Sequence, residues 1–419
     1  MTGGHRPRGG WAGGAVRAAR STWVVFAVLL LGAPLVWRDS GFAQSLLAQT
    51  GAAVVACLAY RLLLAEGGLM SFGHAVYLGL GGYAAAWGLN HAAPAGWPVS
   101  LVPLFGLAAG ALAAALLGWP ATRHRGTAFA MITLGLAELV AAAALMLPEW
   151  FGGEAGVSAN RVVGAPVAGI SFGPAVQVTV LVMLYALVAS ALLVAYTRTP
   201  AGLLLRAVRD NPERVAATGH DPRRVRWLAF VVSGGFSGLA GALSLLVFER
   251  VTADALGAAH SGWLLVFVWL GGVAVWWGGV LAAVLMVGAQ TLLAGWTPAW
   301  ALYLGLVFMV ALLVAPSGLA GALGAGAARW RAGRRAYGHR PAHRRRSAAG
   351  LAGVLGTMLA AAGATALIEM AYQRQQAAAL GPVRRLAGIA LDTSAPLHWA
   401  AAGMVLAVGL VLVVLARRR

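Results

Sequence analysis

The sequence predicts an all-α polytopic membrane protein with about ten core transmembrane helices and a C-terminal two-helix hairpin. Three observations lead to this class. The 419 residues are 60% hydrophobic and only 10% charged, and the mean hydropathy is +0.79. Apolar runs near twenty residues recur along the chain, which is the length that crosses a hydrocarbon core of ~30 Å. The charged residues gather between these runs, as they do in membrane proteins.

The apolar runs give the expected helices in chain order. The predicted spans are 21–37, 42–60, 68–89, 99–120, 127–147, 173–196, 227–248, 262–275, 278–296 and 299–315, followed by 348–368 and 397–416. The 262–275 run is short for a full crossing. We expect it to be tilted, broken or buried within the bundle.

Composition divides the chain into four parts. Residues 1–20 form a basic, Gly-rich tail predicted to be cytoplasmic, and residues 21–325 hold the core. Residues 326–347 are rich in arginine and predict a cytoplasmic linker, and residues 348–419 predict a transmembrane hairpin with a basic end. A cleaved signal peptide is the alternative for the first run, but no clear A-x-A site follows it. We therefore expect an uncleaved first helix.

Arginine placement predicts the orientation of the chain. If the N-terminus lies inside and every run crosses, 25 arginines fall inside and 6 outside. The positive-inside rule favours this parity, with both termini cytoplasmic. The formal charge of +19 is thereby explained by loops and tails. No groove of interleaved aromatic and basic residues is seen, so no nucleic-acid partner is predicted.

The residue inventory argues against an enzyme. All 31 basic residues are arginine. A Walker A loop needs lysine at the nucleotide phosphates, so the chain is not its own P-loop ATPase. The single cysteine, Cys57, lies in an apolar run and forms no disulfide framework or Cys-rich metal site. No nucleophile–base motif occurs, and we predict no catalytic residue, no metal and no cofactor.

The most polar stretch, Thr197–Arg226, lies between two apolar runs and carries seven arginines, two aspartates and one glutamate. Within it, Asn211 is a favoured N-cap followed by proline at the first helical position. Gly219 is a natural helix stop. The sequence therefore predicts a helix of about two turns at Pro212–Thr218, and Ala201–Arg209 before it is also expected to be helical.

This short helix carries small residues with charges beside them, a surface that suits docking into a groove of another protein. An ordinary solvated loop helix is the alternative. The pattern resembles the EAA loop, which forms the coupling helix of bacterial ABC importer permeases, although the acidic residue stands three positions before the first alanine instead of next to it. The predicted ATPase-coupling surface consists of the matching Glu213, Ala216, Ala217 and Gly219 with the flanking Arg209 and Arg214.

Further segments are similar to the LivM-type permeases of branched-chain amino acid ABC transporters. These segments are Gly67–Ala86, Arg125–Leu139, Phe151–Val157, Trp269–Leu285 and Ala315–Gly321. The resemblance covers about residues 20–325, and its motifs are specific jointly and weak singly. The chain departs from the family at Thr127-Ala128-Phe129, where an aromatic pair is common, and this puts the shape of the pathway wall in doubt.

The resemblance implies a permease subunit of an ABC importer that moves branched-chain, hydrophobic amino acids through the bacterial inner membrane into the cytoplasm. It implies a second permease subunit in a heterodimer, two ABC ATPase subunits, a periplasmic substrate-binding protein and the lipid bilayer as partners. A urea or amide permease of the same family is the first alternative. An ion-driven secondary transporter is the second, and it would need several intramembrane ionisable residues. An assembly subunit without a transport path is the third.

Four residues are assigned to the substrate pathway: Ser71, His74, Thr133 and Glu138. Glu138 lies near the middle of its predicted span, where a carboxylate is costly. It either contacts the substrate ammonium group or serves as a structural carboxyl. His74 lies among glycines and either lines the path or braces a close helix crossing. Ser71 stands at a position that matches the family. Thr133 either lines the pathway or has a packing role.

Two further groups stand out, one of glycines and one of charged residues. Gly235, Gly238 and Gly241 recur every three residues and predict a small-residue stripe for helix packing. Glu149, Glu154 and Arg161 lie in the predicted outer loop. They either meet a substrate-binding protein or belong to a solvated loop.

Overall fold

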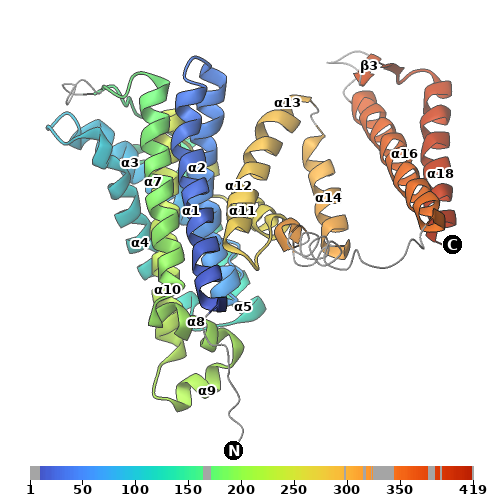
Figure 1. Cartoon of the computed structure of the whole chain (residues 1–419). Coiled ribbons are helices and arrows are strands. Elements are labelled where there is room, and N and C mark those ends of the chain that lie inside the picture. The colour runs from blue at the N-terminus through green and yellow to red at the C-terminus, as the bar shows by residue number, and fades with distance from the viewer. Residues whose placement is uncertain are drawn as a thin grey trace, which may run out of the picture. The chain divides into compact units, whose positions relative to one another are not determined.

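The computed structural model describes residues 10–163, 171–296, 299–314, 318–321, 323, 344–375, 383–386 and 389–417. Nearly all of the described elements are helices, which confirms the predicted all-α class (Figure 1). The chain divides into two compact units, Met1–Thr291 with Phe308–Gly324, and Leu292–Val307 with Ala325–Arg419. Most of the predicted linker at 326–347 and the first nine residues of the predicted tail lie outside the described residues.

The first unit is a bundle of apolar helices. They are α1 (Gly10–Val36), α2 (Gly41–Arg61), α3 (Ala75–Trp87), α4 (Val102–Ala121), α5 (Gly126–Met146), α7 (Ala175–Tyr196), α10 (Pro222–Phe248), α11 (Ala258–Gly271) and α12 (Trp276–Gly288). Across the described chain, six helices are long and apolar enough to cross a membrane, and four shorter apolar helices accompany them. The protein is therefore a polytopic membrane protein.

Short elements connect and extend these helices. They are the π-helical η1 (Leu62–Gly67) and η2 (Gly88–Ala92), the 3₁₀ turns η3 (Val99–Leu101), η4 (Gly153–Ala155) and η5 (Ala253–Leu256), the helices α6 (Pro148–Phe151), α8 (Pro200–Asp210) and α9 (Pro212–Ala217), and the strands β1 (Val157–Ser158) and β2 (Arg250–Val251). Helix α13 (Ala294–Trp296) belongs to the second unit, and η6 (Ala289–Leu293) and α14 (Trp300–Val314) contain residues of both units. The two strands pair antiparallel and join the loop after α5 to the end of α10.

Helix α10 is the centre of the first unit, because α2, α3 and α4 all pack against it. The contacts are made at glycines. A Cβ atom at Gly238 would overlap the carbonyl oxygen of Gly106 on α4, and one at Gly241 would overlap the carbonyl oxygen of Leu78 on α3. Lipid gives no hydrophobic drive for helix pairing, so close backbone approach supplies the attraction. The predicted small-residue stripe is a packing surface.

The predicted span 68–89 is wrong in its first part. Helix α2 runs on through η1, and the chain then turns at Gly68, whose φ of +63° is readily available to glycine. Residues 69–74 are not helical, and α3 begins only at Ala75. The residues of this break are mostly apolar or small, so hydropathy alone does not reveal it. Helix α3 is therefore a short helix that begins inside the bundle.

The predicted span 262–275 is displaced by four residues. Helix α11 begins at Ala258 and ends at Gly271, because Gly272 adopts a φ of +113°. Its 14 residues extend for ~21 Å, which is less than the ~30 Å of a hydrocarbon core. The expectation of a segment too short for a full crossing is confirmed. Helix α12 then begins at Trp276.

The second unit contains the predicted C-terminal hairpin. Helices α16 (Arg344–Gln375) and α18 (Pro396–Arg417) pack antiparallel, and both are longer than predicted. A Cβ atom at Gly363 would overlap the backbone nitrogen of Leu406, so these helices also meet at glycine. The strands β3 (Val383–Leu386) and β4 (Ile389–Asp392) pair antiparallel in the connection, and the sequence did not predict them.

Candidate coupling and transport site

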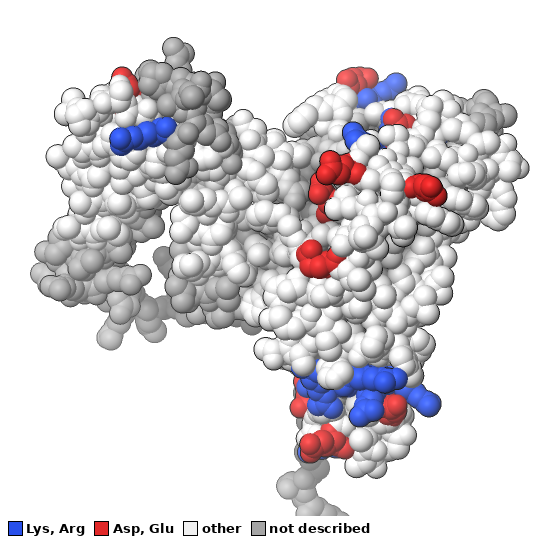
Figure 2. All heavy atoms as spheres, turned by 180° about the vertical axis from the view of Figure 1, so that it is seen from behind, with Lys and Arg blue, Asp and Glu red and all other residues white. Residues whose placement is uncertain are grey.

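One end of the first unit is rich in arginine and consists of α8, α9 and the start of α10. Figure 2 shows basic side chains gathered at this end, whereas the middle of the unit is almost free of charge. Asn211 caps α9, and its side-chain oxygen accepts from the Arg214 backbone N–H at 3.0 Å. Gly219 follows the helix with a φ of +85°. The predicted helix Pro212–Thr218 and its stop therefore agree with the structure within one residue.

The predicted coupling surface is exposed at this end. All six of its residues are exposed: Arg209, Glu213, Arg214, Ala216, Ala217 and Gly219. In α9, only Val215 is buried. This side chain anchors the helix, while the two alanines are exposed and form a small, smooth face. Such a face is suited to a groove on another protein.

Arg209 has a different role from the other members of the predicted surface. Its guanidinium donates to the carbonyl oxygen of Ala65 in η1 and to Asp210 Oδ1 at 2.9 Å. Arg209 therefore fixes α8 to the end of α2, and the structure does not place its guanidinium on the free face of α9.

A carboxylate that the sequence motifs do not single out connects this end to the bundle. Glu66 in η1 pairs with Arg206 of α8 and, at 3.7 Å, with Arg61 of α2. The side chains of Glu66 and Arg61 are only 10% and 8% exposed. Arg206 also donates to the carbonyl oxygen of Thr197 at 2.9 Å. The available signal was a single acidic residue at the end of an apolar run, with one arginine five positions before it and an arginine-rich island elsewhere.

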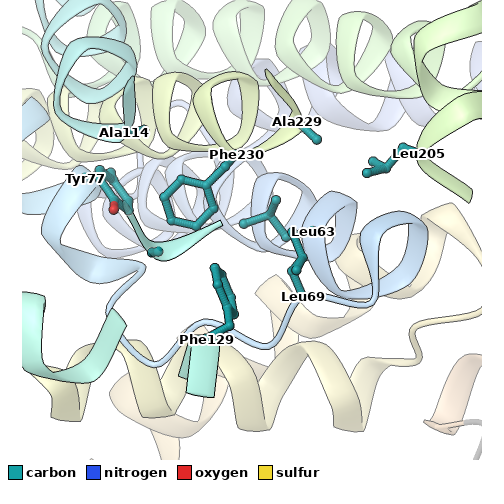
Figure 3. Close-up of a cluster of buried hydrophobic side chains, with 9 residues drawn as sticks. Leu63, Leu69, Tyr77, Ala114, Phe129, Leu205, Ala229 and Phe230 are labelled. Atoms are coloured by element: carbon teal, nitrogen blue, oxygen red, sulfur yellow. The ribbon is translucent and has the colours of Figure 1, made fainter. Parts of the chain in front are cut away.

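An apolar cluster joins α8 to five other elements, η1, α3, α4, α5 and α10 (Figure 3). Leu205 of α8 is fully buried in this cluster with Leu63 of η1. The ring of Phe230 on α10 meets Phe129 of α5 edge to face at 5.9 Å, and Tyr77 of α3 at 5.3 Å. Helix α8 contacts α10 and η1 directly, so a displacement of α8 disturbs two elements of this cluster.

His74 stands at the start of α3 and is fully buried. Its Nε2 atom lies 2.7 Å from Ser237 Oγ and 3.2 Å from Ser233 Oγ, in the central turns of α10. Ser233 donates its hydroxyl to the carbonyl oxygen of Ala59 on α2. The imidazole thus holds α3 against the middle of α10, which favours the bracing alternative for His74.

Thr133 of α5 is placed close to the same break before α3. Its Oγ1 accepts from the backbone N–H of Phe72 at 3.2 Å, and Gly73 packs directly on the Thr133 backbone. Ser71 lies in the same loop and is fully buried. Among the described residues, its hydroxyl and the Nδ1 atom of His74 have no hydrogen-bond partner. The structure therefore gathers three of the four predicted pathway residues around one loop.

The fourth predicted residue, Glu138, is exposed on α5, about one and a half turns beyond Thr133. Its Oε1 atom accepts from the backbone N–H of Ala258 at 3.4 Å, at the start of α11. The neighbouring Ser261 accepts from the Ala75 backbone N–H, at the start of α3, at 2.9 Å. The N-termini of two short helices therefore converge beside α5, and each carries partial positive charge.

The outer-loop residues separate into two groups. Arg161 is structural: its guanidinium pairs with Glu249 at 3.7 Å and donates to the carbonyl oxygens of Phe172 and Leu246, both at 3.0 Å. Glu149 and Glu154 are exposed, and neither forms an ion pair within the described part of the chain.

A polytopic bundle with short helices that meet at buried polar groups is typical of membrane transport subunits. Residues 42–316 match the family described as the permease component of branched-chain amino acid transport systems. The match covers well over half of the chain, and the protein belongs to this family of transport permeases. The C-terminal hairpin lies outside the matched residues.

Two curated relatives are similar over the same part of the chain. The high-affinity branched-chain amino acid transport system permease protein LivM of Escherichia coli (strain K12) is 29% identical over 291 residues, which cover 64% of this chain and 67% of the relative. The LivM protein of Salmonella typhimurium (strain LT2) has the same identity and coverage. No solved structure matches the chain.

Replacement of Glu66 by glutamine tests the ion-pair link, by which we mean the pairing of Glu66 with Arg61 and Arg206. The change leaves Arg61 and Arg206 without a counter-charge, and we expect the free energy of unfolding to fall by roughly 2–3 kcal/mol. This is less than for a fully buried pair, because Arg206 is partly exposed. Thermal unfolding of the detergent-purified protein measures this loss. Asp39→Asn, which breaks the exposed Arg38–Asp39 pair, is the control and should leave the melting temperature unchanged. Equal melting temperatures for wild type and Glu66→Gln would show that the link contributes nothing.

Proposed function

We propose that this chain is a permease subunit of an ATP-driven importer that carries branched-chain amino acids across the bacterial inner membrane into the cytoplasm. The observation that carries the proposal is the exposed α9 on a chain of this permease family. Both named relatives are permease proteins of high-affinity branched-chain amino acid transport. In this proposal the subunit hydrolyses nothing itself.

The proposed partners follow from the surfaces that the chain leaves free. Two ATPase subunits supply the energy, and one of them receives α9. A second permease subunit completes the membrane part as a heterodimer, and a periplasmic binding protein delivers the substrate. The arginine-rich end faces the cytoplasm together with both termini, because this arrangement satisfies the positive-inside rule.

The ion-pair link gives the proposed route of the power stroke. Movement of α9 displaces α8, because only Asn211 stands between the two helices. Helix α8 is held to the end of α2 by the pairing of Arg206 with Glu66, and to the bundle by Leu205. Closure of the ATPases therefore moves the end of α2 and the break before α3, which is the element that the pathway residues surround.

Glu138 supports a transport path along α5. Among the six long described spans, it is the carboxylate that lies away from the helix ends. Hydrocarbon does not solvate an ionised carboxylate, so the side of α5 that exposes Glu138 faces water or a partner subunit. An amino acid has an ammonium group for Glu138 and a carboxylate for the positive helix ends of α3 and α11. We place the substrate at this junction.

The alternatives differ in what they require. A urea or amide permease would share the coupling surface but would have no use for a negative charge opposite two helix N-termini, since its substrate is neutral. An ion-driven transporter needs a relay of intramembrane ionisable groups. The described spans offer Glu138 and no second carboxylate near it.

Uptake by the assembled transporter tests the function, and Ala217→Arg tests the coupling. Vesicles that contain the chain and its partners should take up labelled leucine, and not labelled urea, when ATP is supplied. Ala217→Arg should abolish ATPase co-purification and reduce uptake at least tenfold, because a long charged side chain fills the small face of α9. The same substitution at Ala155, at the opposite end of the unit, should leave co-purification intact. Undiminished uptake by Ala217→Arg would refute the docking role of α9.

Glu138→Gln separates a substrate contact from a structural carboxyl. The amide oxygen can still accept from the Ala258 N–H, so the start of α11 keeps its partner while the negative charge is lost. We expect the half-saturation concentration for leucine uptake to rise about tenfold, with an unchanged melting temperature and a largely restored value in Glu138→Asp. A lower melting temperature with an unchanged half-saturation concentration would assign Glu138 a structural role only.

A further inference from the structure

A cavity of about 840 Å³ opens at the arginine-rich end of the first unit. Its walls come from the end of α2 with η1, the end of α7, α8, and the turn between α11 and α12. Four arginines line it, at positions 61, 198, 206 and 209, and Glu66 is the one carboxylate among the lining residues. Asp210 neutralises Arg209 from outside the lining, so two positive charges remain without a counter-charge.

The basic groups of this cavity are not all satisfied within the described chain. The Nε atom of Arg61 is buried without a hydrogen-bond partner among the described residues. Arg198 is exposed and forms no ion pair in the same part of the chain. A buried donor without a partner costs free energy. An anion with several acceptor oxygens, such as a phosphate group, supplies what these guanidinium groups lack.

The surroundings favour an anion that is attached to an apolar tail. A smaller hollow of about 390 Å³ shares Val194 and Arg198 with the cavity, and apolar atoms of Trp23, Ala191 and Ala195 line most of it. Trp23 of α1 stacks on Trp276, which lines the larger cavity, with ring centroids 4.6 Å apart. Tryptophan is enriched at the level of lipid headgroups. The two hollows therefore join a basic cavity to an apolar groove at the membrane interface.

We propose that this pair of hollows binds one anionic phospholipid. The phosphate lies among Arg61, Arg198 and Arg206, and an acyl chain follows the groove between α1 and α7. Basic pockets between membrane helices are the sites where anionic headgroups bind. A zwitterionic lipid carries a compensating cation and binds more weakly, and a free phosphate ion lacks the tail that the groove accommodates. This lipid site is separate from the transport path, so its existence does not depend on which substrate the protein carries.

Lipid titration of the purified full-length chain tests the site. The detergent-solubilised protein is titrated with phosphatidylglycerol, with phosphatidylcholine of the same acyl chains, and with inorganic phosphate, and the bound molecules are counted by native mass spectrometry. We expect saturable binding of one phosphatidylglycerol, and weak binding of the other two. Arg198→Gln should weaken phosphatidylglycerol binding about fivefold, since a basic residue at a membrane surface contributes roughly that factor.

Two variants keep this test decisive. Arg198→Lys retains the charge and should retain most of the binding, which separates electrostatic loss from misfolding. Arg223→Gln removes an exposed arginine at the same end of the unit but outside the cavity, and it should have no effect. Equal binding of phosphatidylcholine and phosphatidylglycerol, or an equal loss in both glutamine variants, would overturn the proposal. Arginine-dependent binding of inorganic phosphate with the affinity of the lipid would assign the site to free anions instead.

Discussion

The contact between the backbones of α10, α3 and α4 is the constraint on which the rest of the first unit depends. Inside a bilayer the helices gain nothing by hiding apolar side chains from lipid, so their association relies on close packing and on hydrogen bonds. Glycines at 106, 238 and 241 remove the side chains that would hold these backbones apart. Helix α3 has only 13 residues and stays in the bundle because of these contacts. They place His74 beside the serines of α10 and the break before α3 beside Thr133.

A second interaction joins this core to the arginine-rich end. Exposed ion pairs contribute little in water, whereas removing one partner of a buried pair costs about 3–5 kcal/mol. The Glu66 side chain is buried, whereas its partner Arg206 is partly exposed. Arg206 belongs to α8, and α8 is directly followed by α9. Leu205 adds an apolar contact to the same helix. In the proposed transport cycle, α8 connects the exposed face of α9 to Glu66 and to the buried cluster that holds Leu205.

The sequence predicted those parts of the structure that depend on near neighbours. The cap at Asn211 and the stop at Gly219 arise from residues within one turn of the helix they bound, and both are confirmed. The break at 68–74 was missed, because a loop of small and apolar residues has the hydropathy of a helix. The hydrogen bond between Phe72 and Thr133 joins residues 61 positions apart. The ion pair of Glu66 with Arg206 joins residues 140 positions apart. No local pattern encodes such pairs.

The most direct test of this helix packing is whether α4 and α10 touch where the glycines allow it. A Cβ atom at Gly235 would lie 3.2 Å from the Cβ of Ala111, a few tenths of an ångström below the range of about 3.5–4.5 Å found in disulfides. In a Cys57→Ser background, the pair Ala111→Cys and Gly235→Cys should form an intramolecular disulfide in membranes under mild oxidation. The pair Ala111→Cys and Gly135→Cys, whose second position has no neighbour within 4 Å, should remain reduced. Absence of the first cross-link, with both cysteines present and the protein inserted, would contradict the packing from which the site is derived.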